Sequence, residues 1–336
     1  MARILVTGAA GFIGSHVSHR LLERGDVVVG LDNLNAYYDV DLKKARLARL
    51  AEFADFEHAC ISLEDVDAVA ALFASFRPER VINLAAQAGV RYSLENPLAY
   101  VTSNVLGFLN ILEGCRSIGV DNLVFASTSS VFGANGALPQ SVRQGAAHPL
   151  TLYAATKLAN EDMAHSYAHL FGFPCTGLRF FTVYGPWGRP DMALFRFTKA
   201  ILSDQPIDLY GQGMMQRDFT YIDDIASGVI AALDRPAAID PAWDSLNPNP
   251  STSGVAPWRI LNIGNSQPVE LMRYVEVLEE KLGRKARINH MDMQPGDVRR
   301  TAADITETIA ALDYAPTTSV EAGVGRFVDW YLDYYR

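Results

Sequence analysis

The sequence of 336 residues is poor in cysteine and in positive charge, and both shortages limit what the protein can be. Its three cysteines, Cys60, Cys115 and Cys175, lie far apart, so they form neither a disulfide framework nor a metal-ligand spacing. Lys and Arg number 29 against 38 Asp and Glu, a net charge of −9 without any basic run. Nucleic acid is therefore not an expected partner.

Long hydrophobic runs are also missing. No apolar stretch is long enough to span a bilayer, and Arg3 enters a predicted strand without a charged-then-apolar leader. Together with the cysteine usage, this predicts a cytoplasmic protein that does not contact a membrane. No metal is expected either, because His165 and His169 lie four residues apart without a third ligand and are predicted to occupy a solvated helix face.

The first half of the chain alternates between strand and helix patterns. Residues 4–6, 27–29, 81–84 and 123–126 are short apolar runs of the kind found in strands that are buried on both faces. Between the first two, Ile13, Val17 and Leu21 repeat at helical spacing, and Gly25 is expected to end that helix. This alternation predicts an α/β fold with a right-handed, doubly wound parallel sheet.

The second half is more mixed. Helices are predicted over residues 191–202, 224–233 and 269–282, and a late strand over 260–263. Residues 240–257 are rich in Pro, Ser and Asn and predict an exposed loop. Asp223 and Asp224 are interpreted as the N-cap of the helix that follows them.

A glycine turn follows the first strand and opens the first helix. Gly8 permits a tight turn, Gly11 lets the backbone approach a pyrophosphate, and Gly14 lets the helix pack closely on the sheet. Asp32 ends the second strand, where its carboxylate can accept a hydrogen bond from a ribose and repels a 2′-phosphate. Because its neighbour is Asn33 rather than Arg, the pattern predicts NAD rather than NADP. Glycine spacing alone would indicate only helix packing, but strand, turn, helix and acid occur here in order.

Tyr153 and Lys157 lie four residues apart at the start of a predicted helix, and this spacing places both on one face. An ammonium beside a phenol favours the phenolate, so the tyrosine can take a proton from a sugar hydroxyl while NAD takes the hydride. Such a pair is common on solvated helix faces. Only its combination with the glycine turn gives it a catalytic interpretation.

These motifs together resemble the extended short-chain dehydrogenase/reductases that act on nucleotide sugars, and the resemblance covers nearly the whole chain. It implies a Rossmann-type doubly wound parallel sheet with a smaller mixed α/β C-terminal substrate domain. The motifs that carry the resemblance are the glycine turn, residues 83–86 (NLAA), 127–133 (STSSVFG), Tyr153 with Lys157, and 217–219 (RDF).

Within that family, the sequence most resembles the UDP-glucuronate 4-epimerases, through residues 35–39, 87–93, 152–157 and 180–193. The resemblance implies catalytic roles for Tyr153, Lys157 and Thr128, with Thr128 bonded to the sugar 4-hydroxyl. It implies that Arg217 contacts the diphosphate and Asp297 the uridine ribose. The implied cofactor-binding residues are Gly8, Gly11, Phe12, Ile13, Gly14, Asp32, Asn33, Lys43, Ser62, Leu63, Leu84, Ala85, Ala86, Tyr153 and Lys157.

The sugar carboxylate is assigned to neutral hydroxyls and one cation. The resemblance implies that Ser129, Ser130, Thr182 and Arg189 hold it. The segment before Val131 contains no acidic residue, whereas related decarboxylases and dehydratases carry one there. Neutral hydroxyls and a planar guanidinium can hold a carboxylate still and so suppress loss of CO2 from the 4-keto sugar. Ser129 and Ser130 would otherwise only cap a strand end.

Four residues depart from the family pattern, among them Phe132 in place of a usual Tyr and Ala302 in place of a usual aromatic residue. The other two are Ser62 and Gln294. Ser62 stands where an Asp usually lies near the adenine, and a hydroxyl accepts a hydrogen bond there more weakly than a carboxylate does. Gln294 stands where galactose epimerases often have Arg. Both changes concern contacts with the nucleotides and leave the predicted chemistry intact.

The sequence therefore predicts an NAD-dependent isomerase that interconverts UDP-glucuronate and UDP-galacturonate through a 4-keto sugar, for polysaccharide or glycoconjugate precursors. NAD is regenerated in each cycle and needs no partner reductant. The alternatives are a UDP-hexose 4-epimerase, to which Arg189 would offer no carboxylate contact, and a non-catalytic NAD-binding sensor, which would need neither Thr128 nor the Tyr153–Lys157 pair. The expected NAD-binding domain spans 1–182 and about 218–264, and the UDP-sugar-binding domain about 183–217 and 265–336. The resemblance also implies a homodimer through helices near 95–117 and 151–171.

Overall fold

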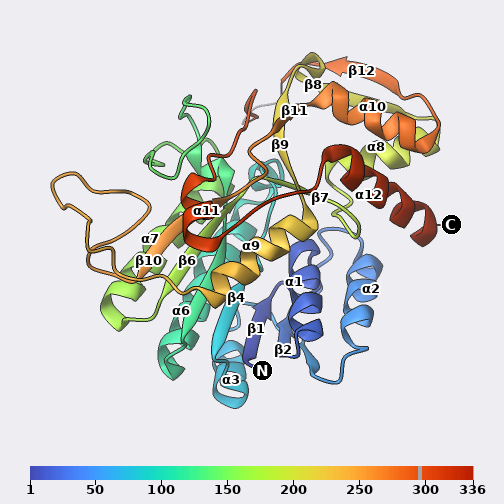
Figure 1. Ribbon diagram of the computed structural model, residues 1–336. Coiled ribbons are helices and arrows are strands. Elements are labelled where there is room, and N and C mark those ends of the chain that lie inside the picture. The colour runs from blue at the N-terminus through green and yellow to red at the C-terminus, as the bar shows by residue number, and fades with distance from the viewer. Residues whose placement is uncertain (294–296, 336) are drawn as a thin grey trace.

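The structure is a computed structural model that describes residues 1–293 and 297–335, so Gln294 lies outside the described residues. Its main sheet contains β1 (Arg3–Thr7), β2 (Val27–Leu31), β3 (Phe56–Ala59), β4 (Arg80–Asn83), β5 (Asn122–Thr128), β6 (Cys175–Phe180) and β10 (Trp258–Ile263). These strands are all parallel, in the order β10-β6-β5-β4-β1-β2-β3 (Figure 1). The predicted doubly wound parallel sheet is confirmed.

Helices cover both faces of this sheet, and for that reason its central strands are apolar on both sides. Ile4, Leu5 and Val6 of β1 are fully buried. On one face, α1 (Phe12–Glu23) packs against α2 (Val40–Leu50) and α9 (Ile222–Asp234). On the other, α6 (Gly107–Ile118) packs against α3 (Val66–Phe76) and α7 (Leu152–Phe171). Gly25, with φ +88°, follows the end of α1 as predicted.

The direction in which the strands are added reverses between β1 and β4. The chain first builds outward from β1 to β2 and β3, then crosses to the other side of β1 and continues with β4, β5 and β6. Thr7 Oγ1 joins the two central strand ends, because it donates to Asn83 Oδ1 at 2.7 Å and accepts from Ala85 N at 3.0 Å. In open α/β sheets, ligands bind at such a reversal, beyond the carboxyl ends of the strands.

A second group of elements lies beyond those carboxyl ends, in the upper right of Figure 1. β9 (Gln216–Tyr221) is the central strand of a sheet with β7 (Thr182–Tyr184) and β11 (Pro268–Glu270), and β8 (Pro206–Tyr210) pairs with β12 (Arg287–Met291). The helices of this group are α8 (Ala193–Leu202), α10 (Leu271–Leu282) and α12 (Val320–Tyr334), whereas α11 (Thr306–Leu312) packs against β10 and α9 beside the main sheet. Phe219 of β9 stacks on Tyr274 of α10 with ring centroids 4.1 Å apart, so a separate apolar cluster supports this region.

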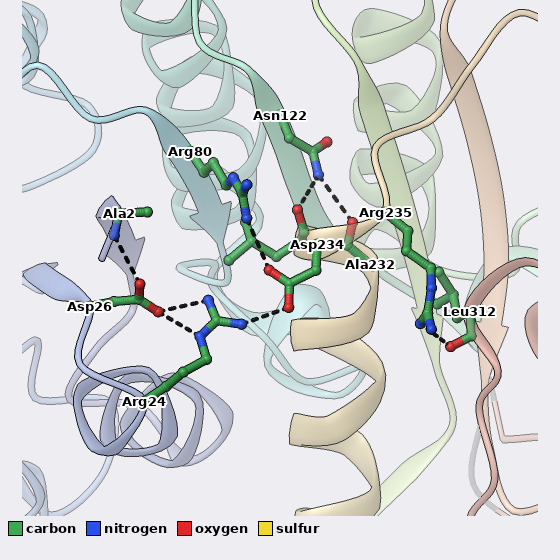
Figure 2. A network of polar contacts seen from close by, with 10 residues as sticks. Ala2, Arg24, Asp26, Arg80, Asn122, Ala232, Asp234, Arg235 and Leu312 are labelled. Atoms are coloured by element: carbon green, nitrogen blue, oxygen red, sulfur yellow. Dashed lines mark hydrogen bonds and ion pairs between the residues drawn. The ribbon is translucent and has the colours of Figure 1, made fainter.

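Charged side chains tie the helices together at the opposite, amino-terminal end of the sheet (Figure 2). Arg24, after α1, donates to Asp26 Oδ2 at 2.7 Å and to Asp234 Oδ2 at 2.6 Å. Asp234, at the end of α9, also accepts from Arg80 of β4 at 2.9 Å. Asn122 donates to the carbonyls of Ala232 and Leu233 and so satisfies the C-terminal turn of α9. This network fixes the end of α9 that lies away from the ligand side of the sheet.

Some sequence expectations were wrong. The helix predicted from Asp191 begins at Ala193, and the helix predicted from residue 269 begins at Leu271 because residues 268–270 pair with β9. Asp224 lies in the first turn of α9, but its carboxylate accepts from the backbone N–H groups of Thr317 and Thr318 at 3.2 Å rather than capping the helix.

The interpretation of His165 and His169 as a solvated helix face holds for His169, which is exposed, but not for His165, which is half-buried. His165 Nε2 lies 2.9 Å from Ser253 Oγ, and His169 Nδ1 lies 2.8 Å from the carbonyl of Val255. Both side chains hold the 240–257 loop on α7, a contact across the chain that local spacing does not reveal. Within residues 1–293 and 297–335, no helix has the length and apolar character needed to cross a membrane.

Candidate active site

A cavity of about 900 Å³ lies between the carboxyl ends of the main sheet and the second group of elements. It brings together residues that the sequence placed in separate motifs, from Gly8 to Asp297. Ser62 does not line the cavity; its Oγ accepts from Asn33 Nδ2 at 3.0 Å, and Asn33 does line it. The predicted residues that line it are Gly8, Gly11, Phe12, Ile13, Gly14, Asp32, Asn33, Lys43, Leu63, Leu84, Ala85, Ala86, Thr128, Ser129, Ser130, Tyr153, Lys157, Thr182, Arg189, Arg217 and Asp297.

The glycine turn has no room for side chains. A Cβ atom on Gly8 would lie 2.8 Å from the backbone nitrogen of Ala85, and Gly8 has φ +71°. A Cβ atom on Gly14 would lie 2.0 Å from the carbonyl oxygen of Gly8, which is far inside van der Waals contact. The turn is closed by hydrogen bonds from Gly8 N to the Leu31 carbonyl and from Gly11 N to the Gly8 carbonyl. The first turn of α1 is thus pressed against the end of β1, as the three-glycine pattern requires.

This arrangement fits the phosphates and ribose of a dinucleotide. Gly11 is the N-cap of α1 and offers no side-chain cap, so the amide groups of the first turn point at an anion site. Asp32, just after β2, is 9% exposed and is oriented by backbone donors, Ala10 N at 3.1 Å and Leu34 N at 2.9 Å. Its remaining lone pairs are available to ribose hydroxyls. The residues present fit NAD.

Lys43 of α2 is held at the edge of the same region. Its ammonium donates to the carbonyl of Asn35 at 2.7 Å and to Asn35 Oδ1 at 2.8 Å, and it lies 4.5 Å from the ring centroid of Tyr38. Burial lowers the pKa of Lys43, and the charge of Asp32 opposes that shift. The side chain therefore carries a cation toward the cavity beside the predicted ribose acceptor.

Sequence reasoning missed Arg46, a fully buried guanidinium on α2. It donates to the carbonyl of Ala10 in the glycine turn at 2.9 Å and to the carbonyl of Trp187 at 2.6 Å. It also donates to the carbonyl of Gly188 at 3.1 Å. One side chain therefore joins the cofactor turn to the loop that carries Arg189. Helical spacing marks Arg46 only as one more polar residue, so no signal in the sequence identifies this bridge.

The catalytic candidates meet where β5 ends and α7 begins. Thr128 is the last residue of β5, and its Oγ1 accepts from Ser130 N at 3.2 Å. Thr151 Oγ1 accepts from Ala154 N at 3.2 Å and so caps α7, which fixes the turn that carries Tyr153. Lys157 follows one turn later and is 2% exposed. Phenol, hydroxyl and ammonium thus line one wall of the cavity.

Burial raises the pKa of the Tyr153 phenol, whereas its hydrogen bond with Thr128 and the charge of Arg189 lower it. Burial also lowers the pKa of Lys157 to about 8, and the carboxylate of Glu161 opposes that shift. The two pKa values therefore move apart, upward for Tyr153 and downward for Lys157, because burial disfavours the charged form of each group. The net shift toward the phenolate that the sequence predicted is not found.

Lys157 is expected to reduce the stability of the fold, because its folded pKa lies below the ordinary 10.5. Below pH 8 the ammonium is charged in both states, so its burial costs up to about 3 kcal/mol, at 1.36 kcal/mol per pKa unit. That cost disappears as the pH rises from 8 to 10.5. Lys157→Met should therefore raise the thermal unfolding midpoint of nucleotide-free protein at pH 7, and the advantage should shrink by pH 10. Equal midpoints for the variant and the wild type at both pH values would contradict this.

The expected carboxylate-binding residues line the same cavity as Tyr153. Ser129 and Ser130 begin a 3₁₀ turn (Ser129–Phe132) directly after Thr128, and Thr182 opens β7. Arg189 reaches the cavity from the loop between β7 and α8. Its guanidinium already holds Asp191, with Nε 3.0 Å from Oδ1 and Nη2 2.6 Å from Oδ2, a partner that the sequence prediction of a helix at Asp191 obscured.

The far end of the cavity carries the residues expected to bind uridine diphosphate. Arg217 of β9 donates to the backbone carbonyls of Gln216 and Arg299, and burial lowers its pKa while the charge of Asp297 opposes that shift. Asp297 forms an ion pair of 3.8 Å with Arg91, whose guanidinium lies 4.9 Å from the ring centroid of Tyr210. Arg91 and Tyr210 were not predicted as site residues, and both line the cavity.

Residues 1–293 and 297–335 contain no group of three His, Cys, Asp or Glu side chains that could hold a metal ion. The site combines a buried Tyr-Lys-Thr group with an open helix N-terminus, which is the arrangement of an NAD-dependent sugar-modifying enzyme. A family model described as the NAD dependent epimerase/dehydratase family matches residues 4–273. The chain belongs to this family, which confirms the resemblance inferred from its sequence.

Individual relatives cover the whole chain. A Rhizobium meliloti protein named probable UDP-glucuronate 4-epimerase is 49% identical over 99% of this chain and 98% of its own. The crystal structure of UDP-glucuronic acid 4-epimerase from Bacillus cereus with UDP-glucuronic acid and NAD has a TM-score of 0.87 and 34% identity, over 99% of this chain and 100% of that one. UDP-glucose 4-epimerase from Thermotoga maritima with UDP-glucose has a TM-score of 0.85 and 28% identity, over 99% and 100%.

Proposed function

We propose that this protein is a UDP-glucuronate 4-epimerase that interconverts UDP-glucuronate and UDP-galacturonate with bound NAD. The observation that carries the proposal is the position of Arg189, which lines the same cavity as Tyr153 and whose charge lowers the pKa of that phenol. A cation beside the reacting hydroxyl suits a sugar with a carboxylate on the neighbouring carbon. The relatives named UDP-glucuronate 4-epimerase support the same conclusion.

The cofactor would be held by the glycine turn and by Asp32. The amide groups at the start of α1 would bind the pyrophosphate, and Asp32 would bind the adenosine ribose. Lys157 would bind the second ribose, and Ser62 would act on the adenine side through Asn33, to which it is bonded. When bound, NAD supplies an acceptor for the hydrogen at C4 and returns it to the opposite face of the sugar.

Tyr153 would remove the proton from O4 of the sugar and later return it. Thr128 would donate to the same oxygen and orient it, since Thr128 lines the cavity with Tyr153 and lowers the pKa of its phenol. The charge of Lys157 would favour the phenolate. Between the two proton transfers the 4-keto sugar would turn over in the cavity, while Arg217 and Asp297 keep the nucleotide in place.

Ser129, Ser130, Thr182 and Arg189 would hold the sugar carboxylate. The 4-keto form is a β-keto acid, and it loses CO2 when rotation brings the bond between C5 and the carboxylate perpendicular to the plane of the C4 carbonyl. Fixed hydrogen-bond donors oppose that rotation, and the absence of an acidic side chain at Thr128-Ser129-Ser130 avoids repulsion. We therefore expect epimerisation without decarboxylation.

The proposal is tested by incubating the purified protein with UDP-glucuronate, without added reductant, and separating the products. UDP-galacturonate as the product, with no pentose nucleotide, is the expected result. Release of CO2 would identify a decarboxylase, and turnover of UDP-glucose but not of UDP-glucuronate would identify a hexose epimerase. A protein that retains NAD but converts neither sugar would support the alternative of a sensor.

We also propose that the protein is cytoplasmic, that it forms a homodimer and that it has two domains. Leu94, Leu98, Val101 and Leu106 are 40–68% exposed on a segment that packs beside α7, which would suit contact with a second copy. Analytical ultracentrifugation tests this, because a homodimer should sediment with twice the 36.8 kDa mass of the chain.

The NAD-binding domain would comprise residues 1–182 and about 218–264, and the substrate domain about 183–217 and 265–336.

A further inference from the structure

Arg189, Asp191 and Tyr37 form a contact across the sugar end of the cavity, which all three residues line. Arg189 binds Asp191 through the side edge of its guanidinium, at 3.0 Å from Nε and 2.6 Å from Nη2. Tyr37, in the segment after β2, donates to Asp191 Oδ2 at 3.3 Å. Two segments of the chain, near residues 37 and 190, are thereby joined beside the predicted position of the sugar carboxylate.

The charges of this pair are strongly coupled. Burial alone would lower the pKa of Arg189, but Asp191 more than offsets this and raises it. Burial alone would raise the pKa of Asp191, but Arg189 more than offsets this and lowers it. The two side chains are only 21% and 32% exposed, so the pair is only partly screened by water. Asp191 therefore stays ionised at neutral pH and neutralises Arg189.

The geometry leaves a second place for a carboxylate on the same guanidinium. The Asp191 contacts use Nε and Nη2, and the end edge formed by Nη1 and the outer hydrogen of Nη2 has the fork geometry that binds a carboxylate. Arg189 can thus hold Asp191 and a uronate at once. Its attraction for the uronate is weakened, because Asp191 already compensates its charge.

An epimerase that acts on a uronic acid must not bind the sugar carboxylate too tightly. For hydrogen to return to the other face of C4, the 4-keto sugar must turn over, and its carboxylate must leave Arg189 during that movement. A buried cation left without a partner is costly, so a carboxylate held by an uncompensated Arg189 would resist release. This reasoning rests on the proposed function.

We propose that Asp191 is the exchange partner of Arg189: it carries the compensating charge while the sugar carboxylate departs and returns, so that uronate binding stays weak enough for the 4-keto sugar to turn. Asp191 is a positioning residue in this scheme, because it acts on the substrate through Arg189. Tyr37 orients Asp191 by its hydrogen bond, and no covalent step is required of either side chain.

Asp191→Asn in the NAD-loaded enzyme tests this proposal, because it keeps the shape and removes the charge. The ratio of the dissociation constants for UDP-glucose and UDP-glucuronate, measured by calorimetry, should shift about tenfold in favour of UDP-glucuronate. KM for UDP-glucuronate should fall, and kcat should fall about tenfold or more. Asp191→Glu, which keeps the charge, should retain a ratio within about threefold of the wild type. Asp244→Asn, at an exposed position of the 240–257 loop, removes the same charge elsewhere and should change neither quantity.

An unchanged or reversed affinity ratio in Asp191→Asn would overturn the proposal, and so would an unchanged kcat. If the asparagine variant does not fold, a wild-type ratio and kcat in Asp191→Ser would overturn it equally. Failure of the proposed function is distinguishable from these outcomes, because the wild-type enzyme itself would then not convert UDP-glucuronate.

Discussion

Tyr153→Phe is expected to lower turnover of UDP-glucuronate by about 1,000-fold while NAD stays bound, because only the proton-transfer group is removed. The ring would keep its place, since Tyr153 packs edge-to-face against Tyr100 with centroids 6.0 Å apart. The substitution leaves the glycine turn, Asp32 and Lys157 unchanged. The measurement is kcat from product separation, together with the NAD content released on denaturation of the purified protein.

Tyr167→Phe is the matched control for this variant. Tyr167 lies on the same helix, α7, and donates its hydroxyl to Glu113 on the outside of the molecule. The control loses the same atom from the same element, so it should turn over substrate at the wild-type rate. Activity of Tyr153→Phe within tenfold of the wild type would remove Tyr153 from the role of base.

Gly14→Ala is expected to weaken NAD binding by at least about 100-fold. The added Cβ atom would lie 2.0 Å from the carbonyl oxygen and 2.7 Å from the carbonyl carbon of Gly8, both backbone atoms that cannot rotate away. Relief requires α1 to move outward by about 1 Å, and a displacement of that size in a binding site typically costs about two orders of magnitude. The amide groups of the first helical turn would then no longer meet the pyrophosphate.

The measurement for this variant is a titration of nucleotide-free protein with NAD, with circular dichroism to confirm that the fold is retained. Gly136→Ala is a suitable control, because a Cβ atom there would meet nothing within 4 Å and the residue has no positive φ. It should bind NAD as the wild type does. Wild-type affinity in Gly14→Ala would mean that the helix is not pressed on the turn as described.

The parts of the site that could be predicted are those whose residues lie only a few positions apart in the sequence. Gly8, Gly11 and Gly14 lie within a single turn, and Tyr153 and Lys157 lie one helical turn apart, so strand and helix periodicity suffice to place them. Family resemblance added Arg189 and Arg217. Every predicted site residue except Ser62 lines one cavity.

What escaped prediction depends on contacts between distant segments. Arg91 faces Asp297 across about two hundred residues of sequence, and no local pattern pairs them. Asp191 looked like the start of a helix, whereas its carboxylate is used by Arg189 and Tyr37. Asp224 looked like a helix cap, but tertiary structure supplied it with the amides of residues 317 and 318. In each case the sequence showed a polar side chain but did not reveal which distant residue it contacts.

Arg46 has a consequence for the way such enzymes diverge. Its guanidinium simultaneously holds the Ala10 carbonyl under the cofactor and the Trp187 and Gly188 carbonyls just before Arg189. A lineage that acquires a new sugar by remodelling residues 187–192 must keep those two carbonyls where they are, or it disturbs the dinucleotide turn as well. This loop is therefore expected to tolerate mutations that change its side chains but not those that move its backbone. Sugar preference should drift by substitution at positions such as 189 and 191, and insertions or deletions there should be lost by selection.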